Sequence, residues 1–248
     1  MVIYYSYTLS WTEAAIQDVI AQLPPLRRKK AERYRQFSGQ RESAAATLLA
    51  VRALWEDGVT VPSPRWRECP AAELIQPGDW PRRAAALDWT PAPDGKPFAN
   101  GILCPEANVK NRRYLSLSHT EGAVAAAVAG RPLGVDIQAE QPLRPGFFEG
   151  ILRRFSSPEQ ERLSALPPEK RTPAFYAHWA MKESVMKLCG QGLRLPMDSF
   201  CLYPEGEGRY RSSLEGRPLR LFTRRLPGTL AAPDGYTLAV AEYAEDLS

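Results

Sequence analysis

The middle of the chain contains Tyr114-Leu-Ser-Leu-Ser-His119, Ala123-Val-Ala-Ala-Ala-Val-Ala129 and Val135-Asp-Ile-Gln138 in close succession. The first segment alternates strictly, which places Ser116 and Ser118 on one side of a strand. The alanines of the second segment favour a helix by propensity, but tertiary context often overrides propensity, and a turn rich in glycine and proline follows. We therefore predict a buried hairpin here, followed by a short third strand.

A longer helix is predicted from about Pro173 to Cys189, with Gly190 as its C-terminal cap. Within it, Trp179, Glu183 and Lys187 recur every fourth residue and line one face, with neighbouring Cβ atoms about 5–6 Å apart. Glu183 and Lys187 could form a simple ion pair along the helix. This face alone therefore does not define a site.

The other segments predict a mixture of helices and strands. Residues 2–9 are typical of a strand, and Thr12 caps a helix that ends near Gln22. A basic, then apolar, helical stretch is expected from Leu26 to about Trp55, whereas residues 61–97 lack any regular period and are expected to be mostly loop. Residues 236–243 alternate like a strand with a solvent-facing edge.

Composition indicates a globular protein. The chain has 248 residues, of which 44% are hydrophobic, enough for one large core or two small ones. It contains no apolar run long enough to span a membrane, and its first residues lack the pattern of a signal peptide, so we expect a cytoplasmic protein without a membrane partner. The four cysteines form no CxxC pair and are expected to be reduced: Cys69, Cys104, Cys189 and Cys201.

A cluster of basic residues lies near the N-terminus, although the formal net charge is only +4. Its members are Arg27, Arg28, Lys29, Lys30, Arg33 and Arg35. Such a cluster suits an anion, and nucleic acid, a phosphorylated cofactor and an acidic protein all fit. A solvated helix face is the simpler alternative.

Acidic and basic side chains of two distant segments indicate phosphate chemistry. Asp136 lies inside a short apolar strand, and Gln138 shares its face because side chains alternate along a strand. If Asp136 and Glu183 converge, they form an oxygen site suited to Mg²⁺, which keeps several waters and bridges phosphates. Lys187, one turn away, could then neutralise a phosphoryl group.

Two motifs carry a family resemblance. Gly134-Val-Asp-Ile-Gln138 resembles the GVDIE-type motif, and Trp179-Ala-Met-Lys-Glu-Ser184 followed by Lys187 resembles the WxxKESxxK motif of Sfp-type 4′-phosphopantetheinyl transferases. Further segments match the family in the same order: Gly95-Lys-Pro97, Ser118-His-Thr120 and Arg153-Arg-Phe-Ser-Ser157. The matching segments reach from about Lys30 to Phe200.

The resemblance implies an α+β protein with the 4′-phosphopantetheinyl transferase fold, in which two similar α/β subdomains of one chain are related by a pseudo-twofold axis. We expect an N-terminal subdomain over residues 1–132, with a loop insertion at about 61–97 and contacts to the coenzyme A nucleotide. The C-terminal subdomain, residues 133–248, would hold the Mg²⁺ and catalytic residues. Coenzyme A would lie between the halves, and a monomer is expected.

The resemblance also implies the reaction, in which the 4′-phosphopantetheine arm of coenzyme A moves to a serine of an acyl or peptidyl carrier protein and 3′,5′-ADP leaves. Asp136, Glu183 and Lys187 would be the catalytic residues. Asp136 and Glu183 would bind Mg²⁺, Glu183 or a water it holds would deprotonate the serine, and Lys187 would steady the pyrophosphate. Gln138 stands where many members have a glutamate, and an amide is a weaker Mg²⁺ ligand than a carboxylate. We expect Gln138 to bind a water or to ligate weakly.

The resemblance assigns further residues to coenzyme A. The expected contacts are Lys30, Arg33, Thr47, Lys96, Ser118 and His119. Two alternatives remain: a non-catalytic module that binds coenzyme A or a nucleotide, and a nucleic-acid-binding protein built on the basic cluster. The intact set of Asp136, Glu183 and Lys187 argues against the first, and the absence of a known reader motif argues against the second.

Overall fold

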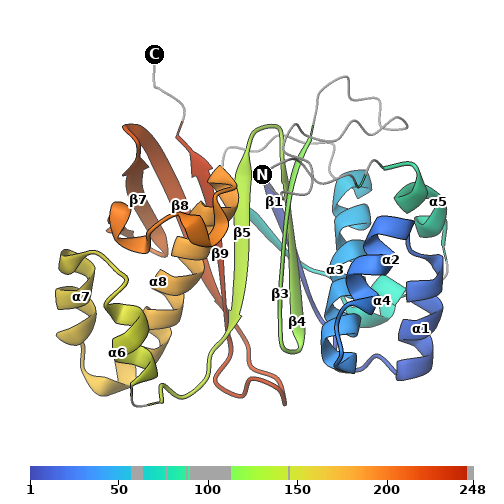
Figure 1. The fold of residues 1–248 in the computed structure, drawn as a ribbon, viewed down its shortest axis with the longest axis horizontal. Helices are drawn as coiled ribbons and strands as arrows, with labels where there is room; N and C mark the ends of the chain where they lie inside the picture. The colour runs from blue at the N-terminus through green and yellow to red at the C-terminus, as the bar shows by residue number, and fades with distance from the viewer. Residues whose placement is uncertain (57–63, 76–77, 88, 90–112, 145, 245–248) are drawn as a thin grey trace. The chain divides into compact units, whose positions relative to one another are not determined.

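The computed structural model describes residues 1–56, 64–75, 78–87, 89, 113–144 and 146–244. They form two compact units, residues 1–133 and 134–248, and each unit combines helices with a sheet (Figure 1). The predicted α+β class is confirmed. None of the described helices is long and apolar enough to cross a membrane.

The N-terminal unit is a sheet of four strands in the order β2-β1-β4-β3, covered by helices. Its elements are β1 (Val2–Tyr7), α1 (Glu13–Gln22), α2 (Pro25–Glu32), α3 (Phe37–Glu56), β2 (Arg65–Glu68), α4 (Ala71–Ile75), α5 (Trp80–Ala85), β3 (Tyr114–Thr120) and β4 (Ala123–Ala129). The predicted hairpin is confirmed, since β3 and β4 pair antiparallel with His119 opposite Val124. The alanines of β4 are all buried, so sheet pairing overrides their helical propensity.

The described structure of this unit adds detail to two predictions. The helical stretch expected from Leu26 to about Trp55 is helical but interrupted, since α2 and α3 are separated by residues 33–36. The ring of Tyr34 packs so closely on Gly39 that a Cβ at position 39 would lie 2.6 Å from it. The region 61–97, expected to be mostly loop, contains β2, α4 and α5, which are too short to show a period in the sequence.

The C-terminal unit is a sheet of five strands in the order β5-β9-β8-β7-β6, with α8 packed on β9 and β8. Its elements are β5 (Leu133–Ala139), α6 (Phe147–Leu152), α7 (Ser157–Ser164), α8 (Pro168–Cys189), β6 (Tyr203–Gly206), β7 (Arg209–Leu214), β8 (Arg217–Leu226) and β9 (Tyr236–Tyr243), with two short 3₁₀ turns at Gly192–Arg194 and Met197–Ser199. The β9 strand was predicted correctly, but its expected solvent-facing edge is wrong: β9 lies between β5 and β8, and all but its last residue are buried.

The long helix α8 begins earlier than predicted, at Pro168 instead of Pro173. Pro173 lies inside the helix and cannot donate the backbone hydrogen bond of its position, but it is close enough to the first turn for the helix to continue. Gly190 ends the helix in a left-handed conformation with φ 76°, and its N–H bonds the carbonyl of Met186 at 3.1 Å. The predicted cap is therefore confirmed.

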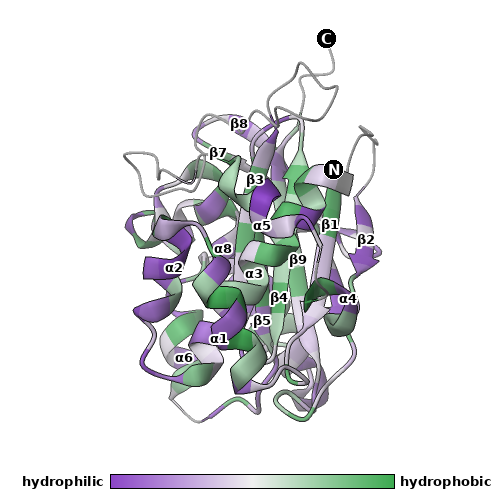
Figure 2. Cartoon of the chain, turned by 90° about the vertical axis from the view of Figure 1, so that its right-hand side faces the viewer, coloured by the Kyte–Doolittle hydropathy of each residue, from purple (hydrophilic) through white to green (hydrophobic). Residues whose placement is uncertain are grey.

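Hydrophobic residues are concentrated in the sheets and on the helix faces that cover them. Figure 2 shows α2 as predominantly hydrophilic and β4 as hydrophobic. Val124, Ala126 and Val128 of β4 belong to one apolar core together with residues of α3. A separate core lies between α8 and the sheet of the C-terminal unit, where Ala239 and Ala241 of β9 contribute. Each unit therefore has an apolar core of its own.

Candidate active site

A glycine sets the distance between β5 and α8. A Cβ at Gly134 would lie 1.9 Å from the carbonyl oxygen of Ser184 and 2.5 Å from the backbone nitrogen of Leu188. Only a residue without a side chain can bring the strand this close to the helix backbone. Asp136 lies two residues further along β5, on the same face as Gly134, and therefore faces the same helix.

Asp136 is clamped by two side chains. Its carboxylate accepts a hydrogen bond from Lys187 Nζ to Oδ1 at 2.7 Å, and one from Gln138 Nε2 to Oδ2 at 2.6 Å. The Asp136 side chain is 4% exposed, whereas that of Lys187 is 32% exposed. The site therefore has a buried carboxylate and a cation that reaches solvent.

The predicted helix face is present. Trp179, Glu183 and Lys187 are each partly exposed, while most of their neighbours on α8 are buried. Burial raises the pKa of Glu183, and the nearby negative charge of Asp136 raises it further, whereas Lys187 and a hydrogen bond from Trp179 lower it. The structure thus joins Lys187 of α8 to Asp136 of β5, with Glu183 one helical turn before Lys187.

Aromatic rings support this face of the helix. The rings of Trp179 and Phe147 stack with centroids 5.6 Å apart, and Tyr176 stacks on Trp179 at 6.4 Å. Phe147 is nevertheless 43% exposed. An apolar surface from α6 therefore lies next to the turn of α8 that carries Glu183.

The other lysine of the motif, Lys182, points into the core. Its Nζ forms an ion pair with Glu159 at 2.8 Å, and both side chains are fully buried. The same ammonium donates to the carbonyls of Met197, at 2.7 Å, and Phe200. Glu159 also accepts from the backbone N–H of Leu202 at 3.0 Å. Lys182 therefore ties α8 to α7 and to the segment after the helix, and it does not face Glu183.

The side chains around Asp136 fit a divalent cation. Asp136 and Glu183 supply the carboxylate oxygens that hard cations prefer, and the negative charge of Asp136 contributes to the raised pKa of Glu183. No group of three histidine, cysteine or acidic side chains suited to a metal occurs in the described part of the chain. Two carboxylates suit Mg²⁺, which is commonly bound by one or two carboxylates and keeps several waters.

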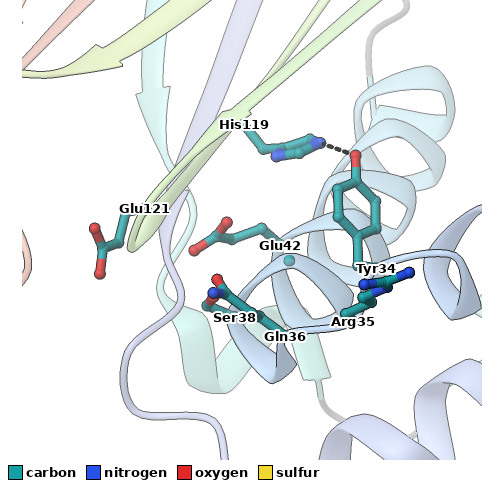
Figure 3. A pocket seen from close by; sticks show the side chains of 8 residues that line it. Tyr34, Arg35, Gln36, Ser38, Glu42, His119 and Glu121 are labelled. Carbon is teal, nitrogen blue, oxygen red and sulfur yellow. Dashed lines mark hydrogen bonds between the residues drawn. The ribbon is translucent and has the colours of Figure 1, made fainter.

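The predicted coenzyme A residue His119 lines a pocket of the N-terminal unit. This pocket of about 520 Å³ is lined by Tyr34, Arg35, Gln36, Ser38, Gly39, Glu42, His119 and Glu121 (Figure 3). Tyr34 Oη and His119 Nε2 are hydrogen-bonded at 3.2 Å, and their rings meet edge to face. Glu42 accepts from the N–H of Gly122 at 2.8 Å, and burial raises the pKa of its carboxyl group.

The other predicted coenzyme A residues of this unit are scattered. Ser118 is buried in β3, and because neighbouring strand residues face opposite sides, it does not share the face of His119. Lys30 and Arg33 are exposed at the end of α2. Lys96 lies outside the described residues.

Thr47 requires a correction. It is fully buried in α3, its hydroxyl donates to the carbonyl of Ser43 at 2.9 Å, and it accepts from Arg27 Nε at 3.0 Å. The Arg27 guanidinium lies over the ring of Trp89 at 5.3 Å, and burial lowers the pKa of Arg27 to about 10. A buried hydroxyl that already makes two hydrogen bonds does not present itself to a ligand, so we do not retain Thr47 as a coenzyme A contact.

Sequence reasoning missed the contributions of Gly134 and Tyr34, and it missed a buried ion pair in the core of the C-terminal unit. Gly134 was read only as part of a motif, although a glycine at the start of a strand is a signal of close backbone approach. Tyr34 contacts His119 from a position that only the tertiary fold brings near. No signal in the sequence could have shown that Lys182 and Glu159 pair in the core.

The close contact between β5 and α8, with two carboxylates and a lysine beside it, is thus the candidate site of this α+β protein. Residues 132–241 match the 4′-phosphopantetheinyl transferase superfamily, and this range includes every residue of the Asp136 site. The resemblance predicted from the motifs is therefore confirmed for this part of the chain.

Curated relatives agree with the family match. The chain is 35% identical over 127 residues to a 4′-phosphopantetheinyl transferase of Bacillus subtilis, covering 51% of this chain and 54% of the relative. It is 30% identical over 139 residues to the 4′-phosphopantetheinyl transferase Sfp of Bacillus subtilis strain 168, covering 54% and 59%. It is 28% identical over 162 residues to a putative 4′-phosphopantetheinyl transferase of Synechocystis, covering 62% and 61%. The alignments thus span somewhat more than half the length of these relatives.

Proposed function

We propose that this chain is a 4′-phosphopantetheinyl transferase, which moves the phosphopantetheine arm of coenzyme A onto a serine of an acyl or peptidyl carrier protein. The observation that carries the proposal is the convergence of Asp136, Glu183 and Lys187 beside Gly134, inside the segment that matches the family. We also propose the finer features of the family for this chain: two pseudo-symmetric halves, action as a monomer, and a cytoplasmic location.

Asp136 and Glu183 are the residues that would hold Mg²⁺, and the ion would supply charge neutralisation at the pyrophosphate. Glu183, or a water it holds, accepts the proton of the carrier serine. The serine oxygen then forms a bond to the β-phosphorus of coenzyme A, and the bond to 3′,5′-ADP breaks, with its electron pair leaving on the nucleotide. Lys187 is exposed enough to turn from Asp136 toward the pyrophosphate and stabilise its charge.

For the rest of coenzyme A, we propose contacts from His119, Ser118, Lys30, Arg33 and Lys96. His119 is the best supported of these, because it lines a pocket and is oriented by Tyr34. Lys30 and Arg33 are supported by their exposure on a basic helix. The alternative of nucleic-acid binding loses part of its basis, because two members of the basic cluster serve the fold: Arg27 is buried against Thr47, and Arg28 donates to the carbonyl of Leu23 at 3.2 Å.

The carrier protein is proposed to contact the surface around α6. Phe147 is exposed there, and Arg153 and Arg154 follow at the end of the helix. Apolar and basic side chains together suit an acidic helix of a carrier protein. This surface adjoins the turn of α8 that carries Glu183, since Phe147 stacks on Trp179.

Mass spectrometry of apo carrier proteins tests the proposal. An acyl carrier protein and a peptidyl carrier protein are each incubated with the purified chain, coenzyme A and Mg²⁺. We expect a mass gain of one phosphopantetheine arm on the carrier serine, and none when Glu183→Ala replaces the wild type. Glu169→Ala, the same substitution in the exposed first turn of α8, is the matched control and should retain activity.

The outcomes separate the candidate functions. An unchanged mass with every carrier, combined with saturable binding of coenzyme A, would support the non-catalytic binding module instead. Salt-dependent binding of duplex DNA without carrier modification would support the nucleic-acid alternative.

A further inference from the structure

We infer that Gln138 is a positioning residue that holds the Asp136 carboxylate in its metal-binding orientation, while leaving the site with one negative charge fewer than a glutamate would supply. The inference rests on the proposed function, because it concerns the Mg²⁺ site proposed there. It assigns to the amide a role as hydrogen-bond donor to Asp136, in place of the expected role of binding a water or ligating the ion weakly.

The contact between Gln138 and Asp136 fixes the orientation of the amide. The Gln138 nitrogen lies 2.6 Å from Asp136 Oδ2. A carboxylate oxygen only accepts hydrogen bonds, so an amide oxygen at this distance would set two acceptors against each other. The nitrogen must therefore face Asp136, and the amide donates to the residue that would bind the cation.

Two hydrogen bonds hold the Asp136 carboxylate in place without a metal ion. Gln138 donates to one carboxylate oxygen and Lys187 to the other, at 2.6 Å and 2.7 Å. A glutamate at position 138 would share the face of Asp136 and place a second negative charge beside it. Such a pair repels unless a cation lies between the carboxylates, whereas the amide stabilises Asp136 by itself.

Glu140, the next acidic residue along the chain, does not replace the missing charge. It follows the last residue of β5, two residues beyond Gln138. Its side chain is fully buried, forms an ion pair with Arg225 at 2.8 Å and accepts from Thr237 at 2.7 Å. Glu140 is thus held in a separate network, and Asp136 and Glu183 remain the acidic side chains of the site.

The consequence is a preformed site of moderate cation affinity. Affinity for a hard divalent cation rises with the number of charged ligands. Gln138→Glu should therefore bind the cation more tightly but should be less stable without it. The wild type should bind the cation less tightly but should be more stable without it.

Direct metal binding tests this inference without any measurement of activity. Mn²⁺ is titrated into the metal-free protein, and the unbound ion is measured by electron paramagnetic resonance. Gln138→Glu should lower the Mn²⁺ dissociation constant by about tenfold or more. Gln141→Glu adds the same charge three residues away on an exposed side chain, and it should leave the dissociation constant nearly unchanged.

Thermal unfolding supplies a second readout. Without metal, Gln138→Glu should melt about 2–4 °C below the wild type, and saturating Mg²⁺ should raise its melting temperature more than that of the wild type. Gln138→Leu removes the donor without adding charge. It should also melt lower, but without any gain in Mn²⁺ affinity.

The inference is overturned if Gln138→Glu binds Mn²⁺ no more tightly than the wild type, or if it is equally stable without metal. If either result is found while the wild type still modifies a carrier protein, the proposed function is retained and only the inference fails. Tighter Mn²⁺ binding by the variant, with no carrier modified by the wild type, would overturn the function and keep the inference.

Discussion

Gly134 and Ser184 belong to different elements, yet their backbones lie so close that a methyl group on Gly134 would come within 1.9 Å of the Ser184 carbonyl oxygen. Neither backbone can move aside locally, because Gly134 lies in a sheet strand and Ser184 in the middle of α8. Everything that Asp136 contacts on the helix depends on this spacing.

Gly134→Ala should therefore weaken both the fold and the site. Overpacking in a core usually costs about 1–3 kcal/mol, and a backbone clash belongs at the upper end of that range. Urea unfolding should show the loss of stability, and carrier modification should fall with it. Gly150→Ala is the control, since a Cβ at this helical position meets nothing within 4 Å, and this change should be neutral or stabilising. Equal stability of the two variants would contradict the role given to Gly134.

Lys187→Gln should reduce the transfer reaction far more than it reduces stability. The change removes the positive charge proposed to act on the pyrophosphate, and loss of one such stabilising group typically lowers kcat by about 10²–10³-fold. Initial rates of holo-carrier formation would measure the effect. Lys170→Gln, on an exposed turn of the same helix, should retain wild-type rates. Wild-type kcat/KM in Lys187→Gln would show that this lysine only pairs with Asp136.

Thr47→Val should affect stability and leave coenzyme A binding unchanged. The substitution keeps the shape of the side chain but removes the acceptor of the buried Arg27 guanidinium. An unsatisfied buried donor costs about 1–3 kcal/mol. Thermal melts and the KM for coenzyme A would separate the two effects. A raised KM at unchanged stability would restore Thr47 as a ligand contact.

Tyr34→Phe should raise the KM for coenzyme A several-fold and change stability little. The ring still packs on Gly39, but the hydroxyl that bonds His119 at 3.2 Å is lost, so the imidazole is held less firmly. Tyr114→Phe, at the other end of β3, provides the comparison and should behave like the wild type. If both variants match the wild type, Tyr34 does not position His119.

His178 should make the protein less stable in mild acid. Burial is the main reason that the pKa of His178 is lowered below its usual value of about 6.5. The neutral ring donates from Nδ1 to the carbonyl of Ala174 at 2.9 Å, and Nε2 has no hydrogen-bond partner among the described residues. Charged groups also act on it: Glu159 favours the protonated form, and Arg162 and Lys182 oppose it.

The folded state therefore binds the proton of His178 less well than the unfolded chain. Its contribution to stability is complete above the unfolded pKa and is lost as the pH falls below about 6.5. Urea unfolding between pH 7.5 and 5.5 should show that the free energy of unfolding falls more steeply with decreasing pH for the wild type than for His178→Gln. If the free energy of unfolding falls equally in both proteins, His178 is not the cause of the acid sensitivity.

The face of α8 and the acidic strand residue could be predicted because they depend on local periodicity alone. Helical spacing places Trp179, Glu183 and Lys187 together whatever the rest of the chain does. Alternation along β5 likewise places Asp136 and Gln138 on one side. That the two segments lie close together could be predicted only from the family motifs, because nothing within either segment defines the distance between the strand and the helix.

The proposed coenzyme A contacts were harder to predict because the exposure of a side chain depends on tertiary packing. Arg27 and Lys30 look alike in the sequence, yet Arg27 is buried under Trp89 while Lys30 is exposed. The break between α2 and α3 was missed for the same reason. Residues 33–36 contain neither proline nor glycine, and the packing of Tyr34 on Gly39 accompanies the turn.

The alanine strand β4 has a practical consequence for protein engineering. Ala125, Ala126 and Ala127 are fully buried, and the alanines at positions 44–46 of α3 are buried in the same unit. A layer made of such small side chains has little room for larger ones, so substitutions intended to fill space there would force strand and helix apart. Attempts to make the protein more heat-resistant should instead replace exposed helical glycines such as Gly150, where a methyl group meets open space.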